Sequence, residues 1–259
     1  MNIHKVKKKY LQDQVYLYKN LFSKKDFQEL DGVFRTYLEK FFNYKTQNKN
    51  FIFQNKKLHN FLLRKRKNNI YLFRKLYNTI QISSTIYRFL NSNKIIRVAS
   101  QLIGCKPEQL ISTGNQLRID VPHDKKHRLN WHYDFYKYEN KIKFNIKSGL
   151  ILWIPLQDVN KDLGTLEYLK NSYQLKRSSK TNSKGYNIIK LKKSMIDGFE
   201  KKKVEANLGD AFIQSFLILH QSGFNMSDKI RFTLIGRYLN IENKNFKGLK
   251  KSMEPLSLY

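Results

Sequence analysis

Three side chains that can bind a metal ion stand in two short segments of the chain. His132 and Asp134 belong to the tripeptide His132-Tyr133-Asp134, and His220 follows after 85 intervening residues. On an extended segment, residues i and i+2 leave the same face, so one ion could contact both His132 and Asp134. Two histidines and one carboxylate form a ligand set that leaves positions open on non-heme Fe(II), although other first-row ions also bind such donors. We therefore expect these three residues to hold Fe(II).

An arginine follows the second histidine at a spacing that suggests a cosubstrate site. The open positions on the ion can take O2 and a bidentate 2-oxo acid such as 2-oxoglutarate, whose far carboxylate needs a cation. Arg231 stands eleven residues after His220, and the run Phe232-Thr233-Leu234-Ile235-Gly236 after it is mostly apolar. A guanidinium pairs bidentately with a carboxylate, and a buried unpaired guanidinium is costly. We expect Arg231 to lack a protein partner and to lie, with Thr233, on a strand beside that of His220; the other interpretation is a solvated surface arginine.

These segments resemble motifs of one family. The stretch His220-Gln-Ser222-Gly223-Phe-Asn225, with Arg231 eleven residues after the histidine, resembles the distal motif of the phytanoyl-CoA dioxygenase family. The segment Trp131-His132-Tyr133-Asp134 is similar to its HxD motif, and the stretches 149–158 and 163–165 resemble its central strand pair. The resemblance covers roughly residues 110–240.

The resemblance implies a fold, cofactors and a reaction. The fold would be a double-stranded β-helix, and the cofactors would be Fe(II), 2-oxoglutarate and O2. Arg231 and Ser222 would bind the C5 carboxylate of 2-oxoglutarate, and Trp153 would lie beside it, although a plain core role for Trp153 stays open. The reaction would hydroxylate a C–H bond while 2-oxoglutarate decarboxylates to succinate and CO2. Related halogenases have a small residue at the carboxylate position, so Asp134 favours hydroxylation over halogenation; desaturation, epimerisation and ring closure stay open.

One segment departs from the family pattern. The family has Pro-Gly-Ser-His a few residues after the position of Gly164, whereas this chain has Lys170-Asn171-Ser172-Tyr173. That loop often borders the substrate entrance, so the substrate of a family member cannot be carried over. Phe135, Tyr136 and Tyr138 could line a substrate pocket or simply pack.

The elements that would position these residues follow from periodicity. Apolar residues at helical spacing predict helices from a Ser23/Asp26 capping box to about Phe41, over 69–80, and up to Ile103, where Gly104 ends the helix. After Pro107 the pattern predicts strands: Leu117–Val121, Gly149–Leu156, Thr165–Leu169, Tyr186–Leu191, Lys203–Ala206, Ala211–Ile213, Leu217–His220 and Arg231–Leu239. We expect a mainly β protein with helices (α+β): a helical part packed on a jelly-roll core. The chain would be a single domain with a mainly helical part at 1–106, the core at 107–242 and a polar tail at 243–259.

Composition limits the partners. The net charge is +30, which is compatible with a nucleic-acid-directed oxygenase or an anionic small-molecule substrate. The lysines are spread along the chain, however, and no dense aromatic and basic stripe is visible, so we expect a small-molecule substrate and no nucleic acid. Cys105 is the single cysteine, no apolar run is long enough for a membrane span, and no secretory signal is visible, which predicts a cytoplasmic protein.

Two further alternatives remain. One is a jelly-roll binding module with a vestigial metal site. The other concerns His123 and His127, whose i,i+4 spacing could bind metal on a helix; Pro122 and two lysines between the histidines favour a basic loop over the site instead.

Overall fold

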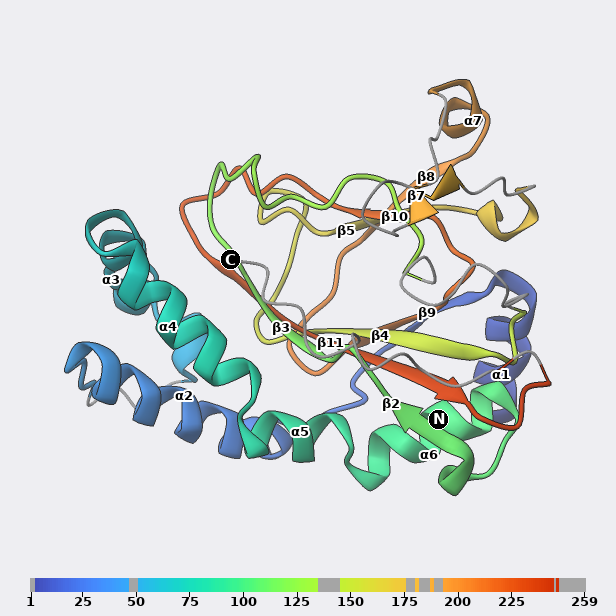
Figure 1. Cartoon of the computed structure of the whole chain (residues 1–259), viewed down its shortest axis with the longest axis horizontal. Helices are drawn as coiled ribbons and strands as arrows, with labels where there is room; N and C mark the ends of the chain where they lie inside the picture. The colour runs from blue at the N-terminus through green and yellow to red at the C-terminus, as the bar shows by residue number, and fades with distance from the viewer. Residues whose placement is uncertain are drawn as a thin grey trace.

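The computed structural model describes residues 3–46, 51–134, 145–175, 180–181, 187–188, 193–244 and 246. These residues form three layers: helices, a six-stranded sheet, and a smaller sheet on the sheet face opposite the helices (Figure 1). All strand pairs within the described residues are antiparallel, so the protein is a mixed structure of helices and antiparallel sheets.

The larger sheet carries the arginine-bearing strand near its centre. Its order is β1 (Val15–Tyr18), β9 (Ala211–Ser215), β4 (Gly149–Pro155), β11 (Arg231–Asn240) and β2 (Leu110–Ser112), and β3 (Gln116–Asp120) also pairs with β11. Side chains alternate between the two faces. On β4, Leu152 and Ile154 join the helix-side core, whereas Ile151 and Trp153 join the cluster between the sheets. The predicted strand over 149–156 is confirmed, and burial of both faces explains its continuous apolar run.

The smaller sheet carries the second histidine. Its order is β10 (His220–Ser222), β5 (Leu166–Leu169) and β8 (Lys201–Val204). A two-stranded ladder joins β6 (Lys180–Thr181) to β7 (Asn187–Ile188), and the short helix α7 (Lys193–Asp197) precedes β8. The rest of the predicted strand Tyr186–Leu191 lies outside the described residues.

Two expectations about the strand of His220 are wrong. The strand begins at His220 and not at Leu217, because 216–219 form a turn in which the Leu217 N–H donates to Ser215 Oγ and the Ile218 N–H donates to the Ser215 carbonyl. The strand also does not lie beside β11. β10 and β11 belong to different sheets, and residues 223–230 carry the chain from one sheet to the other.

Among the described residues, six helices come before β2 in the sequence, with β1 between the first and the second: α1 (Ile3–Asp13), α2 (Gln28–Phe42), α3 (Lys56–Asn68), α4 (Ile70–Gln81), α5 (Ser84–Leu90) and α6 (Asn93–Ile103). Short 3-10 segments cover Lys24–Phe27, Ile52–Gln54, Pro107–Gln109 and Ser172–Gln174. The Ser23/Asp26 capping box is present, and Gly104 ends α6 with a φ of 80°, as predicted. Ile70, the first residue of α4, is 39% exposed and lies outside the buried face of that helix, which includes Phe73, Leu76 and Ile80.

The helices cover the outer face of β11. Phe34 of α2 meets the Phe232 ring edge-on, with the ring centroids 5.6 Å apart, and the Tyr238 hydroxyl donates to the Leu90 carbonyl. His59 of α3 is buried, accepts from the Ile230 N–H through Nδ1 (2.9 Å) and faces the Phe53 carbonyl with Nε2 (2.8 Å). These contacts hold β11 so that Arg231, Thr233, Ile235 and Arg237 face the space between the sheets. None of the described helices has the length and apolarity needed to cross a membrane.

Candidate active site

The structure brings His132, Asp134 and His220 together. Their donor atoms all lie within 4.8 Å of one another. Asp134 Oδ1 lies 3.4 Å from His132 Nε2 and 4.0 Å from His220 Nε2. The backbones of the two histidines form a bridge, because each donates its N–H to the other's carbonyl at 2.9 and 3.1 Å. Among the described residues, this is the one cluster of histidine, cysteine and carboxylate side chains that could hold an ion.

Both imidazole rings are oriented with Nε2 toward the carboxylate. His132 Nδ1–H donates to the Asn130 carbonyl at 2.6 Å, and His220 Nδ1–H donates to the Ile218 carbonyl at 3.0 Å. Burial, with the nearby His132 adding to it, lowers the pKa of His220 to about 3. His220 is therefore neutral at pH 7, with a lone pair on Nε2, which is the state that a metal-binding imidazole needs.

The carboxylate is held by an arginine that sequence reasoning did not single out. Asp134 is 2% exposed, and its Oδ2 accepts from Arg237 Nε at 2.6 Å, while Arg237 Nη1 donates to the Gly114 carbonyl. Burial alone would raise the pKa of Asp134, but the Arg237 guanidinium and the neighbouring histidines hold it well below the usual range. Oδ2 is thereby committed to Arg237, and Oδ1 is left for an ion. Arg237 stands six residues after Arg231 in the same apolar strand, and residues an even number apart on a strand share one face. This spacing could have indicated Arg237 from the sequence.

Arg231 has a protein partner, contrary to expectation. It is 2% exposed, and its Nη2 lies 2.9 Å from Asp120 Oδ2. Arg118 pairs with the same carboxylate from the neighbouring strand β3. Burial would raise the pKa of Asp120, but Arg118 and Arg231 hold it below its usual range. Two guanidiniums share one carboxylate, so a net positive charge remains, and the buried Arg231 Nε and Nη1 have no hydrogen-bond partner among the described residues.

One cavity is lined both by the cluster of His132, Asp134 and His220 and by Arg231. Its lining includes all six predicted site residues: His132, Asp134, Trp153, His220, Ser222 and Arg231. Trp153 is buried and packs in the cluster with Ile151 and Ile235, so it is at once a core residue and a wall of the cavity. A negatively charged ligand that entered the cavity would meet the ion ligands and the spare donors of Arg231 together.

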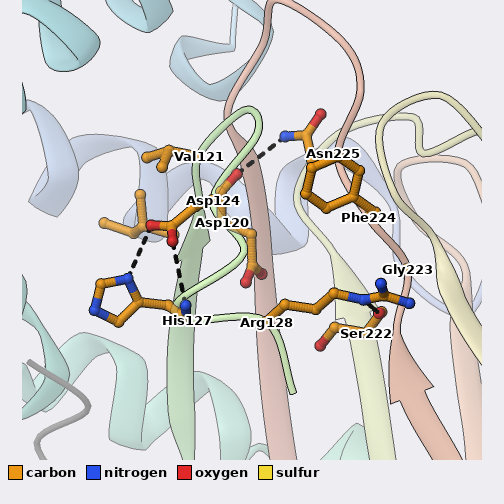
Figure 2. A pocket seen from close by; sticks show the side chains of 10 residues that line it. Asp120, Val121, Asp124, His127, Arg128, Ser222, Gly223, Phe224 and Asn225 are labelled. Carbon is orange, nitrogen blue, oxygen red and sulfur yellow. Dashed lines mark hydrogen bonds and ion pairs between the residues drawn. The ribbon is translucent and has the colours of Figure 1, made fainter. Parts of the chain in front are cut away.

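The loop after His220 is shaped by the residues of its motif. A Cβ on Gly223 would lie 2.2 Å from the Thr165 carbonyl oxygen, so only glycine allows this approach between the loop and the 162–165 turn. Asn225 Nδ2 donates to the backbone carbonyls of Asp120 (3.1 Å) and Lys229 (2.8 Å), which ties the loop to the end of β3 (Figure 2). The motif therefore fixes the loop that leads from Ser222 to Arg231.

His123 and His127 do not form the metal pair that their spacing allowed. His123 has a left-handed φ of 56°, and the segment around it is a turn and not a helix. His127 Nδ1 lies 2.8 Å from Asp124 Oδ2, and Arg128 Nε donates to the Ser222 carbonyl (Figure 2). The basic segment thus packs beside Ser222, which lines the cavity together with Arg231.

The segment that departs from the family pattern, residues 170–173, contacts the sequence neighbours of His132 and His220. Ser172 Oγ accepts from the Leu219 N–H at 2.9 Å, and the Ser172 carbonyl accepts from the Tyr133 hydroxyl at 3.3 Å. Ser172 therefore contacts the neighbours of both histidines. Phe135, Tyr136 and Tyr138 lie outside the described residues.

Comparisons with known proteins agree on the family and the fold. The family model described as phytanoyl-CoA dioxygenase (PhyH) matches residues 15–233. No curated protein matches the chain by sequence.

Solved structures share the fold at low sequence identity. The epimerase SnoN in complex with Fe3+, alpha ketoglutarate and nogalamycin RO superposes with a TM-score of 0.62 at 14% identity, over 92% of this chain and 83% of SnoN. The carbocyclase SnoK from nogalamycin biosynthesis gives 0.60 at 13% identity, over 91% and 83%. EvdO2 from Micromonospora carbonacea var. aurantiaca, complexed with 2-oxoglutarate, gives 0.59 at 13% identity, over 97% and 94%.

Proposed function

Because the chain belongs to the phytanoyl-CoA dioxygenase family, we propose that it is an Fe(II)- and 2-oxoglutarate-dependent dioxygenase. Its reaction hydroxylates a C–H bond of a small-molecule metabolite and releases succinate and CO2. The observation that carries the proposal is the convergence of His132, Asp134 and His220 donor atoms within 4.8 Å, in a cavity that also holds the spare donors of Arg231.

The residues of the cavity fit both an iron ion and 2-oxoglutarate. His132 Nε2, His220 Nε2 and Asp134 Oδ1 are the donors for iron, and each of these side chains is fixed through its other polar atom. Arg231, with Ser222, takes the far carboxylate of 2-oxoglutarate. Bound iron and 2-oxoglutarate supply the oxidising chemistry.

The protein supplies charge balance and exclusion of water. The three charged groups Arg118, Asp120 and Arg231 carry one net positive charge, which the incoming carboxylate neutralises. Trp153 and Ile151 form an apolar wall that keeps water from the reacting atoms. Asp134 occupies the ligand position that related halogenases leave to a halide, which supports hydroxylation.

The proposal includes the finer architecture. The two antiparallel sheets that enclose the cavity form a double-stranded β-helix core at 107–242, within a single domain of 1–259. The described helices of the N-terminal part at 1–106 cover one sheet, and residues 243–259, most of which lie outside the described residues, are assigned to a polar tail from the sequence alone. The shared cluster of buried residues from helices and strands supports a single folding unit.

A second reaction class has a specific observation behind it. The similar structures SnoN and SnoK are named as an epimerase and a carbocyclase. Both names describe products that need not gain oxygen, so epimerisation or ring closure on the same site is the alternative to hydroxylation.

The test is product identification. We would incubate the protein aerobically with Fe(II), 2-oxoglutarate and a metabolite extract, and then compare masses with those formed by His220→Ala. Succinate formation with a product that gained one oxygen supports hydroxylation. Succinate with a product of unchanged mass, or of mass lower by two hydrogens, supports the alternative. Absence of substrate-stimulated succinate with a broad range of extracts would indicate a vestigial site and overturn the proposal.

A further inference from the structure

A buried amide on β9 has no partner. Gln214 is 0% exposed, and both Nε2 and Oε1 of its side chain lack a hydrogen-bond partner among the described residues. Its inward neighbours are apolar: Phe212 lies two residues away on the same face, and Ile151 and Val15 stand opposite it on the adjacent strands. A buried amide that makes no hydrogen bond lowers the stability of the folded protein. Its presence therefore indicates a role, such as a hydrogen bond to a bound ligand.

The sheet register places Gln214 at the metal end of the cavity. Ile151 of β4 pairs with Gln214 on one side and with Arg237 on the other, so Gln214, Ile151 and Arg237 form one row across the sheet. Arg237 is the residue that holds Asp134. Gln214 lines the same cavity as His132, Asp134 and His220. Arg231, in contrast, stands six residues before Arg237 on β11 and therefore lies away from this row.

The cavity therefore has two polar ends with unsatisfied groups. Arg231 offers spare N–H donors at one end, and Gln214 offers an amide at the other. Between them the wall is formed by Trp153, Ile151 and Ile235. This arrangement matches a short dicarboxylate, which has oxygens at both ends and methylene groups between them.

We propose that Gln214 is a positioning residue for the cosubstrate, and that its Nε2–H donates to the oxygens at the 2-oxo acid end of bound 2-oxoglutarate. The inference rests on the proposed function and extends it from the far carboxylate to the metal end. Arg231 fixes the C5 end, and Gln214 fixes the rotation of the 2-oxo acid end about the metal. The amide oxygen stays available to an O–H donor in the same cavity.

The test is an anaerobic titration of the Fe(II) protein with 2-oxoglutarate, followed by its metal-to-ligand absorption band. Gln214→Met keeps the length of the side chain and removes the hydrogen bond. We expect its dissociation constant to rise about ten- to a hundredfold, because the lost bond is made to a charged group, and we expect the band maximum to shift. Gln214→Glu has the same shape but presents a carboxylate, so its loss of affinity should be larger.

A matched control is available in Gln157. This buried glutamine donates to the Ile230 carbonyl (2.9 Å) and accepts from the Phe232 N–H (3.0 Å), so its role is structural. Gln157→Met should lower the melting temperature and leave the band maximum unchanged. Gln214→Met should keep or raise the melting temperature of the ligand-free protein, because it removes an unsatisfied amide.

The outcomes separate this inference from the proposed function. Unchanged 2-oxoglutarate affinity and band position in both Gln214 variants would overturn the inference, and so would a fall in melting temperature as large as that of Gln157→Met. If wild type gave no band at all while binding Fe(II), the proposed function itself would fail. Loss of affinity in Arg231→Ala, but in neither Gln214 variant, would leave the function standing and remove the role of Gln214.

Discussion

Replacing Arg237 should make the stability of the protein depend on metal. Arg237 and Asp134 are buried, with side-chain exposures of 4% and 2%, and their contact is 2.6 Å. Removing one member of such a pair leaves an uncompensated buried charge, which costs about 3–5 kcal/mol. A divalent ion at Oδ1 would offset much of this cost, because it supplies the missing positive charge. In the metal-free protein, Arg237→Leu should therefore lower the free energy of unfolding by about 3–5 kcal/mol.

The assay is urea unfolding of wild type and Arg237→Leu under anaerobic conditions, with and without saturating Fe(II). We expect the difference between the two proteins to be clearly smaller when metal is present. Arg88→Leu serves as a control, because Arg88 pairs with Glu29 at the surface, with exposures of 65% and 72%, and should change stability little in either condition. An equal loss with and without Fe(II) would refute the reasoning, since it would mean that the ion does not share the Asp134 carboxylate.

Three other predictions concern the site and its support. Arg231→Ala should weaken 2-oxoglutarate binding by roughly two to three orders of magnitude in the anaerobic titration, with Fe(II) affinity nearly unchanged; Arg231→Lys should recover part of the loss, and Ser222→Ala should cost less. His220→Ala should abolish succinate formation and weaken Fe(II) binding, and full Fe(II) affinity would contradict the ligand assignment. His59→Gln should reduce the acid sensitivity of folding. Burial lowers the pKa of His59 below its value of about 6.5 in the unfolded chain, so wild-type stability is present above that pH and falls as the pH drops from 7 to 5, which unfolding curves at both pH values would measure.

The sequence predicted the metal ligands better than their surroundings. His132, Asp134 and His220 were accessible because their residue types are rare in apolar segments and their spacing matches a known ligand set. The residues that surround these ligands could not be identified from the sequence in the same way. Asp120 pairs with Arg231 from strand β3, and Gln214 lines the cavity from strand β9. Which strands are neighbours depends on the whole topology and not on local pattern.

The wrong expectations have the same origin. Periodicity indicated that His220 and Arg231 stand on strands, but it carries no information about which sheet each strand joins. The strand β1 was missed because it has only four residues and its pairing with β9 joins positions about two hundred residues apart. The helix α3 was missed because basic residues interrupt its apolar positions, Leu58 and Leu62. Local signals succeeded where a single residue sets the backbone, as at Ser23 and Gly104.

The reciprocal backbone bridge between His132 and His220 has a thermodynamic consequence. Bringing together two residues that are 88 positions apart costs a loop-closure entropy of about 4 kcal/mol, by the logarithmic dependence on loop length. In the folded chain, the packing of the two sheets offsets that cost, and two hydrogen bonds between the backbones of His132 and His220 add to this stabilisation without involving an ion. The binding free energy of the ion is therefore not consumed in assembling its own ligands. A chelator should remove iron and leave the fold intact, and the emptied protein should take up iron again as a preassembled receptor, without refolding.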